Sequence, residues 1–309
     1  MKILQTAILF LLVFKLTAQD DLMDQLDKEV KPTIDYTNAT FKGTRLINGQ
    51  TNETIAAKHL NFWIQHRFGR VNSGFNGFWG LDESRVRIGF DYGITDNLMI
   101  GIGRSSFQKT SDYFVKYKLF RQSKGARIMP VTATLLAGGA INAMPTGYST
   151  ELGTTMNFNN NIERQSYFGQ LILARKFNES VSFQLMPTFL HNNKTESADV
   201  KNDIFAVGIG GRVKVSKRIS VNGEYYAQVR SYDGNSAYPY KNSLSLGVDI
   251  ETGGHVFQLH LTNSRGMIEK QYIAGTTGLW QKGDIHYGFN VSRVFSFDPK
   301  TKQAKKIVY

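Results

Sequence analysis

Strict alternation of apolar and polar residues is the feature that most constrains this chain. In the stretch VRIGFDYGITDNLMIGIG, residues 86–103, an apolar side chain occupies every second position on both sides of the turn Thr95-Asp96-Asn97. Successive side chains of a β-strand point to opposite faces of the sheet. The stretch therefore predicts a hairpin with one apolar face. That face must contact either a protein core or lipid.

The same pattern recurs along the chain from Leu60 onward and predicts about 12 strands. Pro130 and Pro187 fall within two of the runs, where proline removes a donor from the hydrogen-bond ladder. The predicted strands lie near residues 60–68, 85–94, 98–106, 113–121, 127–139, 164–177, 181–190, 203–215, 219–230, 242–252, 255–263 and 284–297.

Short and long connections alternate between these strands. The short ones read TDN, QSKGA, NES, SKR and GG, whereas most of the others are long and rich in Gly, Asn, Ser and Lys. In a transmembrane barrel the short turns gather at the periplasmic end and the long loops at the outer end. A β-sandwich gives no reason for such order. The chain is therefore predicted to be all-β, a transmembrane antiparallel up-and-down β-barrel with both termini on the periplasmic side.

Alternation alone does not say which face is outside, because a soluble lipocalin-like barrel has the same period with the opposite sense. Three features favour lipid outside. The apolar faces are long and uniform, aromatic residues recur near the strand ends, and about 12 strands enclose more space than apolar side chains fill. A soluble periplasmic lipid carrier remains the alternative at the level of the fold.

The ends of the chain carry different signals. Residues 1–18, MKILQTAILFLLVFKLTA, have the layout of a signal peptide cleaved after Ala18. Residues 19–58 are predicted to form an N-terminal extension, periplasmic or lumenal, followed by the barrel at 59–297 and a basic tail at 298–309. We therefore expect export to the bacterial outer membrane.

Composition narrows the function classes. The chain has no cysteine, which excludes disulfides, thiolate metal sites and a cysteine nucleophile. The six histidines show no metal-ligand spacing, and no cofactor is predicted. The net charge of +12 favours an acidic environment such as outer-membrane lipid and lipopolysaccharide. Because the basic residues are mostly scattered rather than clustered, no nucleic acid partner is expected.

The inward positions carry charges of both signs with bases in excess. One interpretation is a channel or binding barrel for small hydrophilic or anionic solutes. The alternative is that these charges pair across a narrow lumen and keep it closed. In the first case Arg87, Lys116, Lys118 and Arg212 attract the solute, and Asp91, Glu224 and Asp249 fix their positions.

A closed barrel would serve as a structural anchor or accessory subunit of an outer-membrane complex. Its outer loops 140–163 and 264–283 would then contact an outer-membrane protein partner, with Tyr272 and Trp280 as exposed aromatic anchors. An exterior lipid-modifying enzyme is a weaker alternative. It needs a serine beside the outward His66, and Phe68 stands where that serine is expected. We therefore predict no enzymatic activity.

Several stretches resemble a known group of proteins. FKGTRLINGQ, FWIQHRFG, GFDYGITDNLMIGIGRSS and KYKLFRQ, within residues 41–69 and 83–122, resemble an uncharacterised family of exported outer-membrane β-barrel proteins from Bacteroidota. The resemblance implies an outer-membrane β-barrel. It supplies no activity, substrate or catalytic residue.

Overall fold

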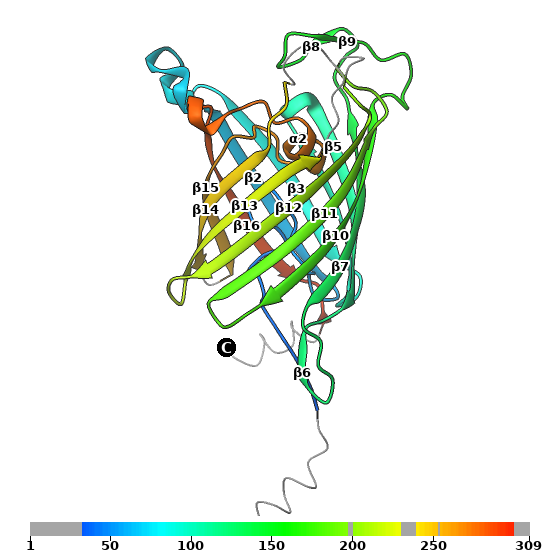
Figure 1. The fold of residues 1–309 in the computed structure, drawn as a ribbon, viewed down its shortest axis with the longest axis vertical. Coiled ribbons are helices and arrows are strands. Elements are labelled where there is room, and N and C mark those ends of the chain that lie inside the picture. The colour runs from blue at the N-terminus through cyan, green and yellow to red at the C-terminus, as the bar shows by residue number, and fades with distance from the viewer. Residues whose placement is uncertain (1–32, 197–199, 230–238, 253, 300–309) are drawn as a thin grey trace, which may run out of the picture.

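Twelve strands pair antiparallel in chain order and close into one barrel in the computed structural model, which describes residues 33–196, 200–229, 239–252 and 254–299 (Figure 1). The last strand pairs with the first barrel strand to close the ring. The predicted fold is thus confirmed. The barrel strands are β2 (His59–Arg70), β3 (Ser84–Gly93), β4 (Leu98–Ser105), β5 (Thr110–Phe120), β7 (Thr132–Asn142), β10 (Gln165–Lys176), β11 (Val181–Asn192), β12 (Asp203–Lys214), β13 (Ile219–Val229), β14 (Ser243–Thr252), β15 (His255–Thr262) and β16 (His286–Ser296).

The strands expose their apolar faces and bury their polar ones. Along β11, for example, Phe183, Leu185 and Phe189 are exposed, whereas Gln184 and Thr188 between them are buried. Neighbouring strands repeat this pattern, so an apolar belt surrounds the barrel. Such a belt is what a membrane barrel presents to lipid. The arrangement contradicts a soluble lipid carrier, which buries its apolar face.

The two ends of the barrel differ as the connection lengths predict. Tight turns at 94–97, 177–180 and 215–218 lie at the short-turn end. The long-loop end carries the longer connections together with the four-residue connection 106–109. The connection QSKGA is an exception. It is longer than predicted, because β6 (Ser123–Gly125) leaves the barrel and pairs with β1 (Ile34–Tyr36). The strand predicted from residue 127 therefore begins after Pro130.

The long-loop end also contains short 3-10 helices and a two-stranded sheet. The 3-10 helices are η1 (Val71–Ser73), η2 (Phe75–Gly80), η3 (Phe107–Lys109) and η4 (Trp280–Lys282), and the sheet pairs β8 (Tyr148–Ser149) with β9 (Thr155–Met156). No helix in the described ranges is long and apolar enough to cross a membrane.

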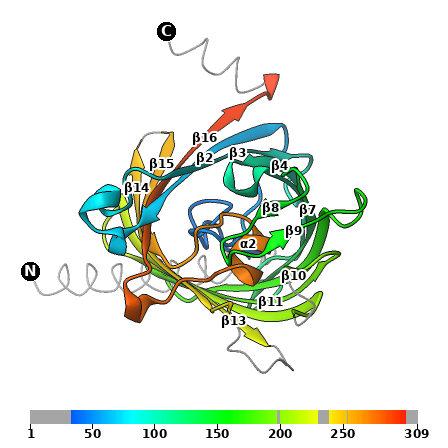
Figure 2. The same cartoon turned by 90° about the horizontal axis from the view of Figure 1, so that it is seen from above.

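Two segments lie inside the ring of strands (Figure 2), and they enter it from opposite ends (Figure 1). From the short-turn end comes the lumen hairpin, residues 40–53, closed by backbone hydrogen bonds between Leu46 and Gly49 and between Thr51 and Thr44. From the long-loop end comes the lumen helix, α2 (Glu269–Ala274). Part of the predicted N-terminal extension thus lies in the lumen. The predicted signal peptide and residues 300–309 of the basic tail lie outside the described residues.

The position of the lumen helix corrects one prediction. Tyr272 was predicted to be an exposed anchor in an outer loop, but it is fully buried, with its ring 5.0 Å from that of Tyr226. The reason is that Met267, Ile268 and Ile273 are also apolar, so this part of the loop folds inward. Trp280 stays in the outer loop, half-buried, and its indole N–H donates to the Leu244 carbonyl at 3.0 Å.

Candidate functional site: a lumen closed by two segments

One carboxylate holds the tip of the lumen hairpin. Glu224 points inward from β13 and accepts backbone N–H groups of Ile47 at 3.3 Å, Asn48 at 2.8 Å and Gly49 at 3.0 Å. Converging backbone N–H groups form a site suited to an anion, and charged acceptors make the stronger hydrogen bonds. A Cβ at residue 49 would overlap the Tyr226 hydroxyl oxygen, so glycine lets the hairpin tip approach Tyr226 without moving it. Glu224 therefore binds the hairpin rather than positioning a lumenal base.

One ammonium holds the base of the hairpin. Lys116 is fully buried on β5, and its Nζ donates to the carbonyl oxygens of Thr44 at 3.1 Å, Thr51 at 3.0 Å and Glu53 at 3.1 Å. A lysine ammonium has three protons, so all of them are used. Lys116 points into the barrel, where its hydrogen bonds are all to the hairpin.

Other inward side chains of the wall complete the attachment. The Asp91 carboxylate accepts the Thr44 hydroxyl at 2.7 Å and the Trp63 indole N–H at 2.8 Å. The hairpin is therefore bound from many sides of the barrel. Further contacts run from Gln184 to the Gln50 carbonyl (2.9 Å), Asn290 to the Ile47 carbonyl (2.9 Å), Gln258 to the Leu46 carbonyl (2.8 Å) and Arg67 to the Asn48 side chain (2.5 Å).

The two lumen segments meet at a buried ion pair. Arg45 of the hairpin lies 3.6 Å from Glu269 of the lumen helix, and their side chains are 0% and 3% exposed. Arg45 also donates to the Asn48 carbonyl at 2.8 Å, and its guanidinium lies over the Phe114 ring. Because one segment comes from each end, this contact joins the two segments inside the barrel.

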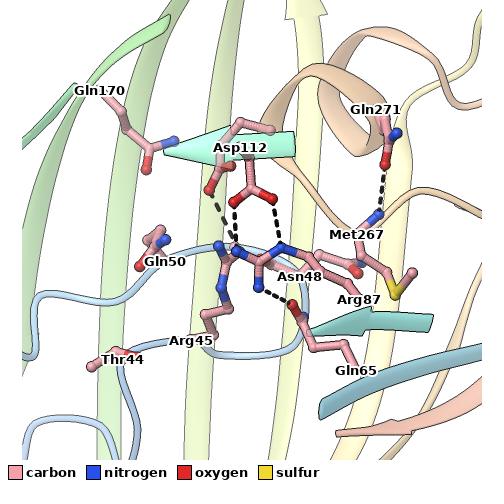
Figure 3. Close-up of polar contacts among 12 residues, drawn as sticks. Thr44, Arg45, Asn48, Gln50, Gln65, Arg87, Asp112, Gln170, Met267 and Gln271 are labelled. Carbon is pink, nitrogen blue, oxygen red and sulfur yellow. Dashed lines mark hydrogen bonds and ion pairs between the residues drawn. The ribbon is translucent and has the colours of Figure 1, made fainter. Parts of the chain in front are cut away.

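Arg87 is neutralised by the wall itself. Its guanidinium binds both carboxylate oxygens of Asp112, at 2.9 and 2.5 Å, and donates to the Gln65 side chain at 2.8 Å (Figure 3). Asp112 was missed because the strand was predicted to begin one residue later. Its alternation with Lys116 is the signal that would have placed it inside.

The remaining predicted lumen residues are not gathered at one place. Arg212 lies 3.3 Å from Glu251, which also binds Lys42 of the hairpin at 2.7 Å. Asp249 accepts the Gln258 amide at 3.0 Å, and Lys118 is half-buried on β5. The predicted bases are therefore distributed over the wall.

The space between the segments and the wall is polar. Both amide atoms of Gln50, both ring nitrogens of His260 and Nε of Arg67 are buried without a partner among the described residues. Buried polar groups of this kind usually bind ordered water. Within the same ranges, no three His, Cys, Asp or Glu side chains lie close enough to hold a metal ion.

One polar pair lies on the lipid-facing side. Ser84 Oγ is 2.7 Å from His66 Nε2, so the neighbouring strand supplies the serine that the sequence lacks at Phe68. The other ring nitrogen of His66 is buried without a partner, and the ring stacks on Phe289. A serine nucleophile needs a base that a third group orients. No described residue bonds that nitrogen.

Residues 41–295 match the model of a family described as a membrane bound beta barrel domain (DUF5777). The chain belongs to this family. The match begins in the lumen hairpin and ends in β16, so the hairpin is part of the family domain. No curated protein matches the chain in sequence.

Solved outer-membrane barrels are among the structures to which the chain is similar. The KdgM porin is 9% identical, with 77% of this chain and 99% of that chain covered and a TM-score of 0.41. The COG4313 outer membrane channel from Pseudomonas putida F1 is 12% identical, with 79% and 98% covered and a TM-score of 0.42. Outer membrane phospholipase A from Escherichia coli is 10% identical, with 80% and 95% covered and a TM-score of 0.41.

Proposed function

We propose that this protein is an outer-membrane β-barrel that is closed at rest and acts as a structural anchor or accessory subunit. The observation that carries the proposal is the meeting of the two lumen segments at Arg45 and Glu269. A solute on the barrel axis would have to displace the hairpin, which Lys116 and Glu224 hold. Each hydrogen bond to a charged group contributes about 1.5–3 kcal/mol, so displacing the hairpin is unfavourable.

The proposal extends to location and partners. The long-loop end faces the outside of a Gram-negative cell, near lipopolysaccharide, and export uses the signal peptide at residues 1–18. Trp280 is a contact for an outer-membrane protein partner. Tyr272 has no such role, because its side chain is buried. No catalytic role is proposed for the Ser84–His66 pair. A fluorophosphonate that labels the wild-type protein but not Ser84→Ala would contradict this.

A second candidate is gated passage of small hydrophilic or anionic solutes. The observation that favours it is that the hairpin contacts the wall mostly through polar groups. Around these contacts lie buried polar atoms that have no partner among the described residues. A polar segment leaves such a site for water at a lower cost than an apolar one. With the hairpin displaced, Arg87 and Arg212 would line the open lumen.

Conductance in a planar bilayer distinguishes these functions. For a closed barrel we expect the inserted wild-type protein to give no stable current steps, and Glu224→Gln to give openings because the hairpin is released. The matched control is Glu179→Gln, whose carboxylate is exposed in a short turn and should leave the barrel closed. Stable steps with anion preference from the wild-type protein would overturn the proposal in favour of solute passage.

A further inference from the structure

A second polar site lies at the long-loop end. A cavity of about 460 Å³, here called the loop cavity, opens between η3, the start of β3 and the connection between β7 and β10. Its wall contains three cationic side chains and, besides the phenol of Tyr148, three aliphatic hydroxyl groups. These are Arg85, Lys109 and Arg265, with Ser106, Ser149 and Thr150.

The cations of the loop cavity outnumber its carboxylates. Glu151 is the one carboxylate among the lining residues, and Arg265 already binds it at 2.8 Å, along with Glu83 at 2.5 Å. Arg85 donates to the Ser84 carbonyl. Neither Arg85 nor Lys109 forms an ion pair with any described carboxylate. With Glu83 included, three cations face two carboxylates, and Arg85 and Lys109 are the cations without an ion pair among the described residues.

The backbone beside these cations is strained. Gln108 and Lys109 adopt φ of +52° and +44°, a region that non-glycine residues rarely occupy. Strain of this kind costs about 1–3 kcal/mol per residue, persists only where the surroundings impose it, and clusters at functional sites. Gln271 of the lumen helix imposes it here, by donating to the Phe107 carbonyl at 3.2 Å and the Thr110 hydroxyl at 3.3 Å.

We infer that the loop cavity binds an anion with several carboxylate or phosphate oxygens, held by Arg85 and Lys109 and by the hydroxyls of the wall. Guanidinium and ammonium groups are the side chains that bind such oxygens most strongly. The inference goes beyond the proposed function, since the cavity lies at the long-loop end and does not require the lumen to open.

Calorimetric titration of the detergent-purified full-length protein tests the inference. The probes are pyrophosphate and citrate at constant ionic strength, and saturable binding of either one is expected. Binding of pyrophosphate alone assigns phosphate chemistry, and binding of citrate alone assigns carboxylate chemistry. No saturable binding of either probe overturns the inference.

Phosphate groups could come from a free solute or from lipopolysaccharide. The titration is therefore repeated on protein in phosphatidylcholine vesicles with and without lipopolysaccharide. Unchanged pyrophosphate binding assigns the site to a free anion. Loss of binding in the presence of lipopolysaccharide assigns it to a lipid phosphate.

Variants locate the binding. Arg85→Gln combined with Lys109→Gln should weaken binding at least tenfold. The matched control is Arg104→Gln, on the outward face of β4, which should change it less than twofold. If the double variant does not fold, Lys109→Gln alone, at an exposed position, should weaken binding about threefold. Equal weakening by the control and the cavity variants would refute the assignment to this cavity.

Discussion

Replacing Glu224 with glutamine tests whether one carboxylate holds the lumen hairpin. The amide has the same shape but a single acceptor oxygen, and its NH2 group would face a backbone N–H. Whichever way the amide lies, at least one of the hydrogen bonds from Ile47, Asn48 and Gly49 is lost. The abandoned N–H is then buried without a partner.

The size of the effect follows from these contacts. A hydrogen bond to a charged group contributes about 1.5–3 kcal/mol, and the bonds that survive become bonds to a neutral acceptor. We expect the docked hairpin to lose about 3 kcal/mol. That loss raises the population of released hairpin roughly 100-fold.

The absence of cysteine makes the assay direct. Gln50→Cys places one thiol in the hairpin, at a buried side chain whose amide atoms have no partner among the described residues. A charged methanethiosulfonate reagent should modify this thiol slowly, and roughly 100-fold faster once Glu224→Gln is added, because modification requires release. Glu179→Gln should leave the rate unchanged. Modification of Gln50→Cys at the rate of a free thiol, or at a rate that Glu224→Gln does not change, would refute the reasoning.

Three further outcomes are expected. Gly49→Ala should speed the modification of the Gln50→Cys thiol, because the new Cβ overlaps the Tyr226 hydroxyl. Gly43→Ala should leave that rate unchanged, because the nearest atom to its new Cβ is 3.5 Å away. Asp112→Asn leaves Arg87 buried and unpaired, so the unfolding free energy should fall by about 3–5 kcal/mol. Denaturant unfolding followed by gel mobility measures this change, and Asp82→Asn, at an exposed position, is the control. Burial lowers the pKa of Lys270 in the lumen helix from 10.5 to about 8, partly opposed by Glu196. The folded chain therefore binds fewer protons than the unfolded chain between these values, stability should rise with pH from about 8 to 10.5, and Lys270→Met should remove that rise.

The barrel wall could be predicted because alternate residues of a strand share a face, so the alternation of apolar and polar residues is visible in the sequence. The strand expected at 181–190 runs from Val181 to Asn192, and the one expected at 203–215 from Asp203 to Lys214. The same alternation places Arg87, Lys116 and Glu224 on the inner face. Alternation fixes the side on which a residue lies, and it says nothing about the partner that the residue meets there.

The contents of the lumen could not be predicted for that reason. Glu224 and Asn48 are 176 residues apart, and no local pattern links them. The lumen hairpin lacks a strong period, and its sequence fits a strand, a periplasmic segment or a piece inside the barrel equally well. For the lumen helix, one feature of the sequence could have indicated its buried position. Met267, Ile268, Tyr272 and Ile273 are too apolar for a loop that stays in water.

The position of the lumen hairpin in the chain has a consequence for assembly. The hairpin precedes β2, and its partners range from Arg67 on β2, 19 residues from Asn48, to Asn290 on β16, 243 residues from Ile47. Contacts of such high sequence separation form late and slow folding. Once β16 has joined β2 the ring has no open seam, so a hairpin left outside would have to thread through the short-turn end. Because the hairpin's contacts with β11 and β16 need strands from far along the chain, its docking is completed only as the seam between β16 and β2 forms.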